Sequence, residues 1–123
     1  MARRTPLTAE QLTAALAGLP AWSGNTTGIQ RTVSDIDFAD AAEVIAELAV
    51  AADELDHHPD VDVRWRTLRI ALSTHSAGGV TALDVEYARR ADEALAALTE
   101  TDPELAEQVD ALVAKRRQPD SGA

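Results

Sequence analysis

The chain contains no cysteine and very few aromatic residues, and these absences limit the kinds of bond and reactive site that it can form. Aromatic residues make up only 3% of the 123 residues. The lack of cysteine excludes disulfide bonds, thiolate nucleophiles and cysteine-based zinc sites. Lysine and arginine are also scarce: the chain has 11 of them against 21 aspartates and glutamates, which gives a formal net charge of −10. Such a surface repels nucleic-acid phosphates and anionic membranes, so we expect no direct binding to either.

Long apolar runs are missing as well. No stretch approaches the roughly 20 apolar residues that span a bilayer. Arg3 and Arg4 are not followed by an apolar segment of signal-peptide length. We therefore expect a cytoplasmic protein. The hydrophobic share of 46%, much of it alanine, is enough for the core of one domain.

What the sequence does contain is clear signals for helices. Thr8 and Gln11 form a capping-box pattern, which predicts a first helix that ends near Gly18. A second helix is predicted from the N-cap Asp37 to just before the pair His57-His58, since Pro59 prevents its continuation. Its apolar residues recur at spacings of three and four, which predicts one buried stripe made of Phe38, Ala41, Ile45, Leu48, Ala52 and Leu55.

A third helix is predicted after Thr81 and Asp84, which repeat the capping-box pattern. The residues expected on its buried face are Leu83, Tyr87, Ala91, Ala94, Leu95 and Leu98. An additional helix is expected to begin at Asp102 and Pro103 and to end in basic residues that suit the negative end of a helix dipole.

Two pairs of strands alternate with these helices. Residues 21–36 have the alternating pattern of a hairpin. From Val61 to Trp65 the apolar residues share one parity, and from Leu68 to Leu72 they share the other, which predicts a tight turn near Arg66 and Thr67. The order predicts an α+β fold, in which a four-stranded antiparallel sheet has helices packed on one face, plus an added C-terminal helix.

The segment "DELDHHPD", residues 53–60, holds two of the three histidines of the chain. One interpretation is a helix C-terminus, where an imidazolium gains about 0.3–1 kcal/mol from the helix dipole. A second is a metal site, which would also need His75 and a carboxylate, because neighbouring residues in an extended chain point to opposite sides. A third is acid–base chemistry, because histidine alone changes charge near neutral pH without help. It requires His57, His58 and His75 to converge at one end of the sheet.

The spacing of these residues resembles the signature of the pterin-4a-carbinolamine dehydratase family. The signature comprises Asp53, His57-His58-Pro59, Trp65, His75 and Asp84, and the segments "ELDHHPD" and "LSTH" are closely similar to the family's own. The likeness extends more weakly to about residue 98, and back through Trp22 to "LTAEQL". We therefore expect a family-like domain over residues 1–100, and the residue pattern beyond it predicts a helical extension over 101–117 and a disordered tail over 118–123.

The resemblance also implies a function. Family members are lyases that dehydrate 4a-hydroxy-tetrahydropterin to quinonoid dihydropterin and water, and they need no metal or organic cofactor. A small-molecule pterin is then the substrate. The family commonly forms dimers or tetramers, and the open edges of the predicted sheet favour a homo-oligomer. Some members bind transcription factors or act as assembly chaperones, so a non-catalytic protein-binding module on the same fold is the alternative.

The resemblance assigns roles to individual residues. It implies a pterin pocket lined by His57, His58, Pro59, Thr74, His75, Ser76 and Ala77. His57 and His75 are the expected acid–base pair, and His58 is expected to hold and orient the pterin. Asp84 is expected to orient His75, to complete the capping box of Thr81, or both. Asp53 either polarises the site or is an ordinary exposed acid, and Trp65 is expected in the core or the pocket wall.

Overall fold

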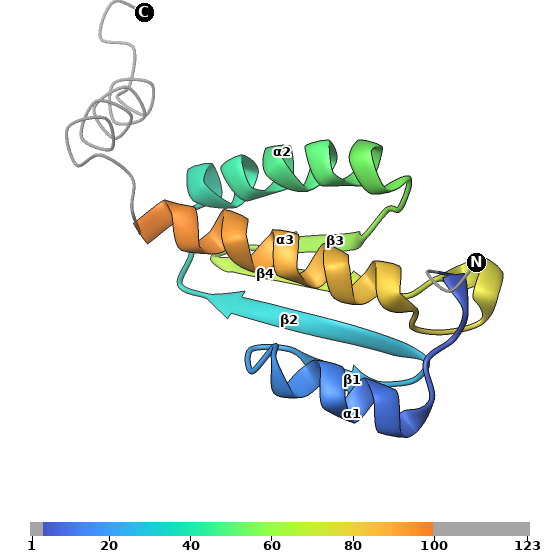
Figure 1. The fold of residues 1–123 in the computed structure, drawn as a ribbon. Helices are drawn as coiled ribbons and strands as arrows, with labels where there is room; N and C mark the ends of the chain where they lie inside the picture. The colour runs from blue at the N-terminus through green and yellow to red at the C-terminus, as the bar shows by residue number, and fades with distance from the viewer. Residues whose placement is uncertain (1–3, 100–123) are drawn as a thin grey trace, which may run out of the picture.

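The computed structural model of the chain describes residues 4–99, which form helices and strands in the predicted order (Figure 1). The elements are α1 (Ala9–Ala17), β1 (Ser23–Asn25), β2 (Gly28–Ser34), α2 (Phe38–Leu55), β3 (Asp60–Arg64), β4 (Thr67–Leu72), the 3₁₀ turn η2 (His75–Ala77) and α3 (Ala82–Thr99). The predicted additional helix and the tail after it lie outside the described residues.

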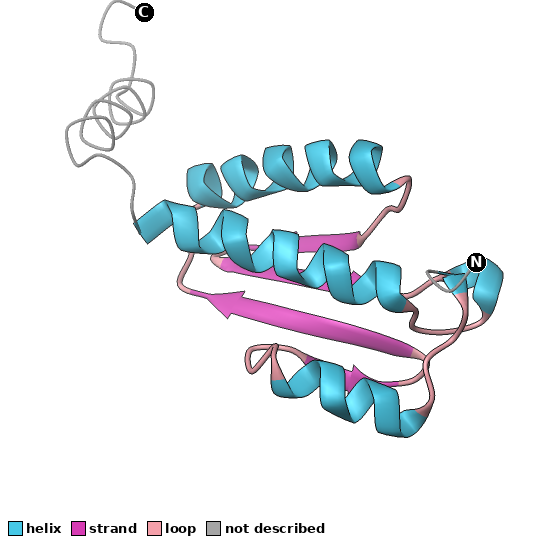
Figure 2. Ribbon diagram, viewed as in Figure 1, coloured by secondary structure: helices cyan, strands magenta, loops and turns pink. Residues whose placement is uncertain are grey.

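The strands form one antiparallel sheet in the order β1-β2-β4-β3. The register places Ile29 beside Leu72 and Val61 beside Ile70, so apolar residues of three neighbouring strands share a face. The helices cover this face, and the other face of the sheet stays uncovered by helices among the described residues (Figure 2). The predicted α+β fold, with helices on one face of a four-stranded sheet, is therefore confirmed.

The start of α1 is fixed by the predicted capping box. The Thr8 side chain accepts a hydrogen bond from the backbone N–H of Gln11, and the Gln11 side chain accepts one from the backbone N–H of Thr8. Next to the cap, the N–H of Leu7 donates to the carbonyl of Val80 at 2.8 Å. The bond from Leu7 ties the start of α1 to the segment that leads into α3.

The buried face of α2 differs from the predicted stripe. Phe38 is 68% exposed, whereas Val44 and Ala51, which the stripe omitted, are each 1% exposed. The helix is turned so that Val44, Leu48 and Ala51 face the core. Spacings of three and four fit either face, and the choice between them is made by packing against α3 and the sheet.

Trp65 also lies where the sequence did not predict it. Arg64 pairs with Thr67 across the hairpin, so Trp65 and Arg66 form its two-residue turn. Trp65 has a left-handed backbone, with φ of 55°, and is 90% exposed. The expectation that it lies in the core or the pocket wall is wrong, because the turn begins one residue earlier than the parity pattern indicated.

Candidate active site

The two adjacent histidines follow a sharp end of α2. The helix stops at Leu55, and Asp56 takes the left-handed conformation with φ of 49°, which aspartate tolerates better than most residues. The backbone N–H of His57 still donates to the carbonyl of Ala52 at 3.1 Å. His57 is then 7% exposed, whereas His58 is exposed. The two imidazoles therefore face opposite environments, as expected for neighbours in an extended chain.

The buried imidazole of His57 contacts the carboxylate of Asp84. Its Nε2 atom lies 2.5 Å from Oδ1 of Asp84, and the aspartate is 0% exposed. The second carboxylate oxygen, Oδ2, accepts from the Thr74 hydroxyl at 2.8 Å and from the backbone N–H of Thr81 at 2.9 Å. The hydrogen bonds of Asp84 therefore go to these three residues, and the expectation that Asp84 orients His75 is wrong.

Asp84 is also part of the N-terminus of α3, as the capping pattern predicts. It lies in the first turn of the helix, where a carboxylate interacts favourably with the helix dipole. Thr81 contributes twice, since its N–H donates to Asp84 and its hydroxyl accepts from the N–H of Leu83 at 3.3 Å. One residue pair thus caps α3 and supplies the partner of His57.

Tyr87 lies one turn further along α3 and contacts the same histidine. Its ring centroid is 6.2 Å from that of His57, with the ring planes at 70°, an edge-to-face arrangement. Its hydroxyl donates to the backbone carbonyl of Leu48 in α2. Burial raises the pKa of Tyr87 to about 12. The sequence placed Tyr87 on the buried face of α3, but gave no sign that it lies against His57.

The third histidine follows Thr74 directly. Thr74 is 2% exposed and forms a bridge to Gly79, and the chain between them makes the turn η2. Gly78 closes this turn with φ of 79°, a conformation that favours glycine. His75 and Ser76 are exposed, and Ala77 is half-buried.

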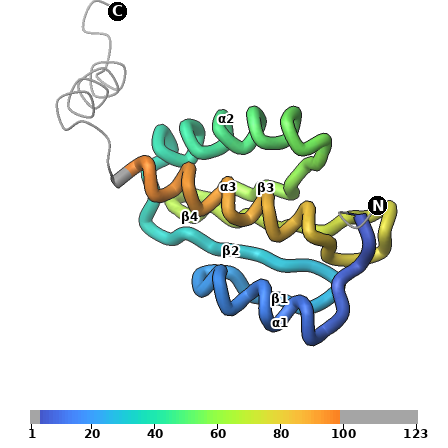
Figure 3. Tube along the Cα trace, in the orientation of Figure 1, coloured from blue at the N-terminus to red at the C-terminus, as the bar shows by residue number. Residues whose placement is uncertain are grey.

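The end of α2, the end of β4 and the start of α3 lie at one end of the sheet (Figure 3). The hydrogen bonds of Asp84 to His57 and Thr74 join these three segments. The exposed residue His58 directly follows His57 in the sequence, and the exposed residue His75 directly follows Thr74. Pro59, half-buried, leads into β3.

Two of the predicted supporting residues do not contact this network. Asp53 is exposed on the last turns of α2. Trp65 lies at the opposite end of β3 from His58, and at about 3.4 Å per step the five steps from Asp60 to Trp65 span about 17 Å. A role for Trp65 in the wall of a site at the histidines is therefore excluded by the course of the strand.

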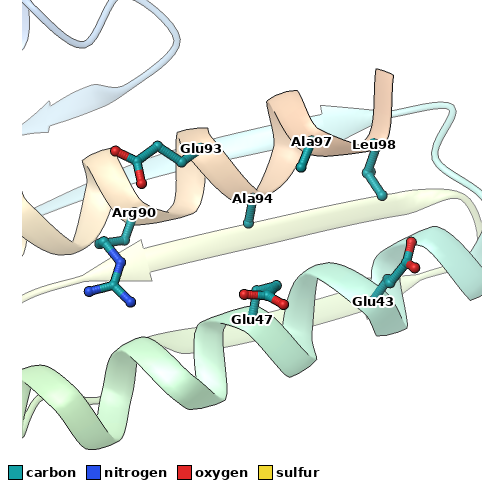
Figure 4. A pocket seen from close by; sticks show the side chains of 7 residues that line it. All are labelled: Glu43, Glu47, Arg90, Glu93, Ala94, Ala97 and Leu98. Atoms are coloured by element: carbon teal, nitrogen blue, oxygen red, sulfur yellow. The ribbon is translucent and has the colours of Figure 1, made fainter. Parts of the chain in front are cut away.

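Two cavities in the described part of the chain are lined by residues other than the three histidines. One, of about 450 Å³, lies between α2 and α3 and is lined by Glu43, Glu47, Arg90, Glu93, Ala94, Ala97 and Leu98 (Figure 4). In the same interhelical region Arg90 forms an ion pair with Glu54 at 2.8 Å, and this hydrogen bond raises the pKa of Arg90. The other, of about 440 Å³, is lined by Leu7, Gln11, Ala15, Leu55, Ala82, Val85, Glu86 and Arg89.

The described residues also bear on the metal interpretation. Within residues 4–99, no group of three or more His, Cys, Asp or Glu side chains is arranged to hold a metal ion. The burial of His57 against Asp84 and the exposure of His58 keep the adjacent imidazoles apart. Over the same residues, no helix is both long and apolar enough to cross a membrane.

The sequence matches one known family over most of its length. The family profile described as Pterin 4 alpha carbinolamine dehydratase covers residues 5–94. The chain belongs to this family. The matched range includes the whole network of Asp84 and all three histidines, so the resemblance seen in the sequence is confirmed.

Individual members of the pterin-4a-carbinolamine dehydratase family are closely similar. A protein of Mycobacteroides abscessus is 44% identical over 86 residues, which cover 70% of this chain and 92% of that protein. One of Nocardia farcinica is 46% identical over 87 residues, covering 71% of this chain and 92% of that protein. Both are named "Putative pterin-4-alpha-carbinolamine dehydratase".

A solved structure supports the same placement. The crystal structure of a protein from Brucella melitensis, described as a transcriptional coactivator/pterin dehydratase, is 33% identical to this chain with a TM-score of 0.69. The match covers 73% of this chain and 98% of that one. The family fold therefore occupies most of the described residues.

Proposed function

We propose that the protein dehydrates 4a-hydroxy-tetrahydropterin to quinonoid dihydropterin and water by acid–base catalysis with histidines. The observation that carries the proposal is the buried pair of His57 and Asp84, which lies at the same end of the sheet as the exposed residues His58 and His75. Family membership supplies the substrate class.

The reaction needs two proton transfers. The hydroxyl on carbon 4a is a poor leaving group until an acid protonates it, after which the carbon–oxygen bond breaks and water departs. The resulting cation loses a proton from the ring nitrogen next to that carbon, which completes the new double bond. A positioned acid–base pair contributes typically 10²–10⁴-fold to such a step, and imidazoles suit it because they gain and lose protons near neutral pH.

Within this proposal His57 and His75 are the acid–base groups and can exchange roles according to the face that carries the hydroxyl. His58 holds and orients the pterin ring. Pro59, Ser76 and Ala77 line the pocket, and they flank the histidines on the two loops that carry them. Asp84 acts through His57, because its carboxylate contacts the imidazole and is itself fully buried.

The test is a direct measurement of water loss from chemically generated 4a-hydroxy-tetrahydropterin, followed by its absorbance with and without protein. We expect the protein to accelerate the reaction over buffer. His57→Ala and His75→Ala should each lower the rate constant by at least tenfold, with far-UV circular dichroism unchanged. Glu43→Gln, an exposed change at the start of α2, should leave the rate constant as it is.

An equal rate with protein and with buffer would refute the dehydratase proposal. Unchanged rates in both histidine variants would mean that the protein is a dehydratase but that residues other than His57 and His75 catalyse the reaction. Since the chain contains 3 histidines, the third variant, His58→Ala, completes the set, and here we expect a higher KM for the pterin.

A protein-binding role is the second candidate, and two exposed aromatic side chains favour it. Phe38 is 68% exposed and Trp65 is 90% exposed, and aromatic side chains are enriched at protein interfaces. The similar protein of Brucella melitensis is described as a coactivator as well as a dehydratase. If binding is the function, replacing Phe38 and Trp65 with serine should abolish partner capture while the dehydration rate stays at the buffer level.

Three further expectations complete the proposal. A dimer or tetramer would cover the open edges at β1 and β3, and sedimentation equilibrium measures this directly. The domain is proposed to occupy residues 1–100 with an extension over 101–117 and a tail over 118–123. Its location in the cytoplasm remains a prediction from the sequence.

A further inference from the structure

We infer that Thr74 and Tyr87 are positioning residues that hold the imidazole of His57 in a single tautomer. In this tautomer Nε2 carries the proton that bonds to Asp84, and Nδ1 is the nitrogen that exchanges protons with the substrate. The inference rests on the dehydratase function proposed above and names the reacting atom of that site.

The direction of the hydrogen bonds around Asp84 is set by simple counting. Thr74 has one hydroxyl proton, and it goes to Oδ2 of Asp84 at 2.8 Å. The Thr81 hydroxyl, 2.8 Å from that of Thr74, must therefore donate to Thr74, and it accepts in turn from the N–H of Leu83. The backbone N–H of Thr81 is a second fixed donor to Oδ2. Both groups around Oδ2 point a proton at it, so this oxygen is held as an acceptor, and two such donors favour the ionised carboxylate.

An acceptor at Asp84 decides the tautomer of His57. An ionised Asp84 has no proton on Oδ1, so the 2.5 Å contact of Oδ1 with Nε2 is a hydrogen bond only when Nε2 carries the proton. The neutral imidazole then has its lone pair on Nδ1. The described residues provide no hydrogen-bond partner to Nδ1, so this nitrogen is available to accept a proton from substrate or to return one.

Tyr87 fixes the plane of the same imidazole. Its ring lies edge-to-face with that of His57, and its hydroxyl is already used by the carbonyl of Leu48. Tyr87 is 0% exposed, so its ring has no room to swing away. Because Leu48 belongs to α2 and Tyr87 to α3, the aromatic wall behind His57 is held from both helices.

The sequence suggested that Thr74 lines the pterin pocket, but its hydrogen bond and burial point to a different role. Its side chain is 2% exposed and its only proton is directed at Asp84. It has no donor left for a pterin, whereas its neighbours His75 and Ser76 are exposed. Thr74 therefore acts through Asp84 and His57, not by contact with substrate.

The first experiment reads the tautomer in the wild-type full-length chain. Nitrogen-15 NMR at mildly alkaline pH, where an imidazole is neutral, distinguishes a protonated from an unprotonated ring nitrogen, and the His57 signals are those lost in His57→Ala. We expect a proton on Nε2 and none on Nδ1. A neutral His57 with its proton on Nδ1 would overturn the inference, whether or not the protein dehydrates pterins.

The second experiment removes the hydroxyl of Thr74. In Thr74→Val we expect a mixture of tautomers at His57 and a kcat lowered by at least tenfold, with KM changed by less than about twofold. Thr74→Ser keeps the hydroxyl and should restore both the single tautomer and most of kcat. Thr32→Val, at an exposed position of β2, is the matched control and should change neither. A raised KM with unchanged kcat in Thr74→Val would instead make Thr74 a substrate-binding residue and overturn its positioning role.

The third experiment tests the ring of Tyr87 separately from its hydroxyl. Tyr87→Phe keeps the aromatic wall, so the His57 tautomer and kcat should stay within about twofold of wild type. Tyr87→Leu removes the wall and should broaden the His57 signals and lower kcat at least fivefold. Equal kcat and sharp His57 signals in Tyr87→Leu would refute the positioning role of the ring. If wild-type protein shows no dehydration, the proposed function fails while the NMR results still decide the tautomer.

Discussion

Nε2 of His57 and Oδ1 of Asp84 lie 2.5 Å apart in the interior, although 27 residues separate them in the chain. The contact joins the loop after α2 to the first turn of α3, and Thr74 brings the end of β4 to the same carboxylate. Since three segments must be in place before the pair can form, the candidate site and the packing of the fold are built by the same hydrogen bonds.

Replacing Asp84 with asparagine should therefore reduce both stability and activity. The asparagine amide has one acceptor oxygen in place of two, and its NH₂ group would face groups that are themselves donors. Leaving a buried polar group without a hydrogen-bond partner costs about 1–3 kcal/mol. We expect the free energy of unfolding in urea to fall by this amount and the dehydration rate constant to fall at least tenfold.

A half-buried carboxylate that also accepts two side-chain hydrogen bonds provides the control for this substitution. Asp92 accepts from Nε1 of Trp22 at 2.8 Å and from Arg31 at 2.5 Å, away from the histidines. Asp92→Asn should lower the free energy of unfolding, by less than Asp84→Asn because water reaches this side chain, but leave the rate constant of the folded protein unchanged. Equal losses of rate in both variants would mean that Asp84 contributes to stability alone.

Local signals in the sequence predicted the elements well, because their causes are local. The capping box of Thr8 and Gln11 needs only four residues, and it forms as expected. The strand hairpins follow from alternation over a few residues in the same way. Phe38 and Trp65 were misplaced because the exposed side of α2 and the position of the turn depend on packing between distant segments.

The candidate site was predicted in its residue types but not in its connections. His57, His75 and Asp84 were singled out from spacing, yet Asp84 was assigned to the wrong histidine. The hydrogen bond of Thr74 to Asp84 was missed because a hydroxyl next to a histidine gives no sign of which way it points. Tyr87, three residues after Asp84 on the same helix face, is the one signal that could have indicated a side chain near the aspartate.

Tyr87 predicts a loss of stability at alkaline pH. Burial raises its pKa from 10.0 to about 12, so the folded state keeps the phenol proton over a range where the unfolded chain has lost it. Stability contributed by the neutral phenol is thus complete below pH 10 and falls as the pH rises toward 12, by about 2–3 kcal/mol in all. Urea unfolding at several pH values measures this slope.

The single tyrosine of the chain makes this prediction easy to check. Tyrosinate absorbance in the folded protein reports Tyr87 alone and should appear near pH 12, or earlier if the protein unfolds first. Tyr87→Phe should remove the part of the alkaline slope that comes from this residue. A tyrosinate signal at pH 10 in folded protein would show that the side chain is exposed.

The cap of α1 should contribute measurably to stability because it satisfies two backbone groups that would otherwise have no partner in the helix. Thr8→Ala removes the side-chain half of the box, and we expect the free energy of unfolding to fall by about 0.5–2 kcal/mol. Thr13→Ala, an exposed change within the same helix, is the matched control and should be neutral or slightly stabilising. Equal effects at both positions would show that α1 is not held by its cap.

The two tryptophans should differ sharply in solvent access, because Trp22 is 4% exposed and Trp65 is 90% exposed. Trp65→Phe leaves Trp22 as the only emitter, and we expect blue-shifted fluorescence with weak acrylamide quenching. Trp22→Phe leaves Trp65, whose emission should be red-shifted and strongly quenched. Trp65→Phe should change the free energy of unfolding by less than about 0.5 kcal/mol. Trp22→Phe should cost about 1–3 kcal/mol, since it replaces a buried indole with a smaller ring and removes the hydrogen bond to Asp92. Weak quenching in both variants would show that Trp65 is buried, as the alternation of the strand first suggested.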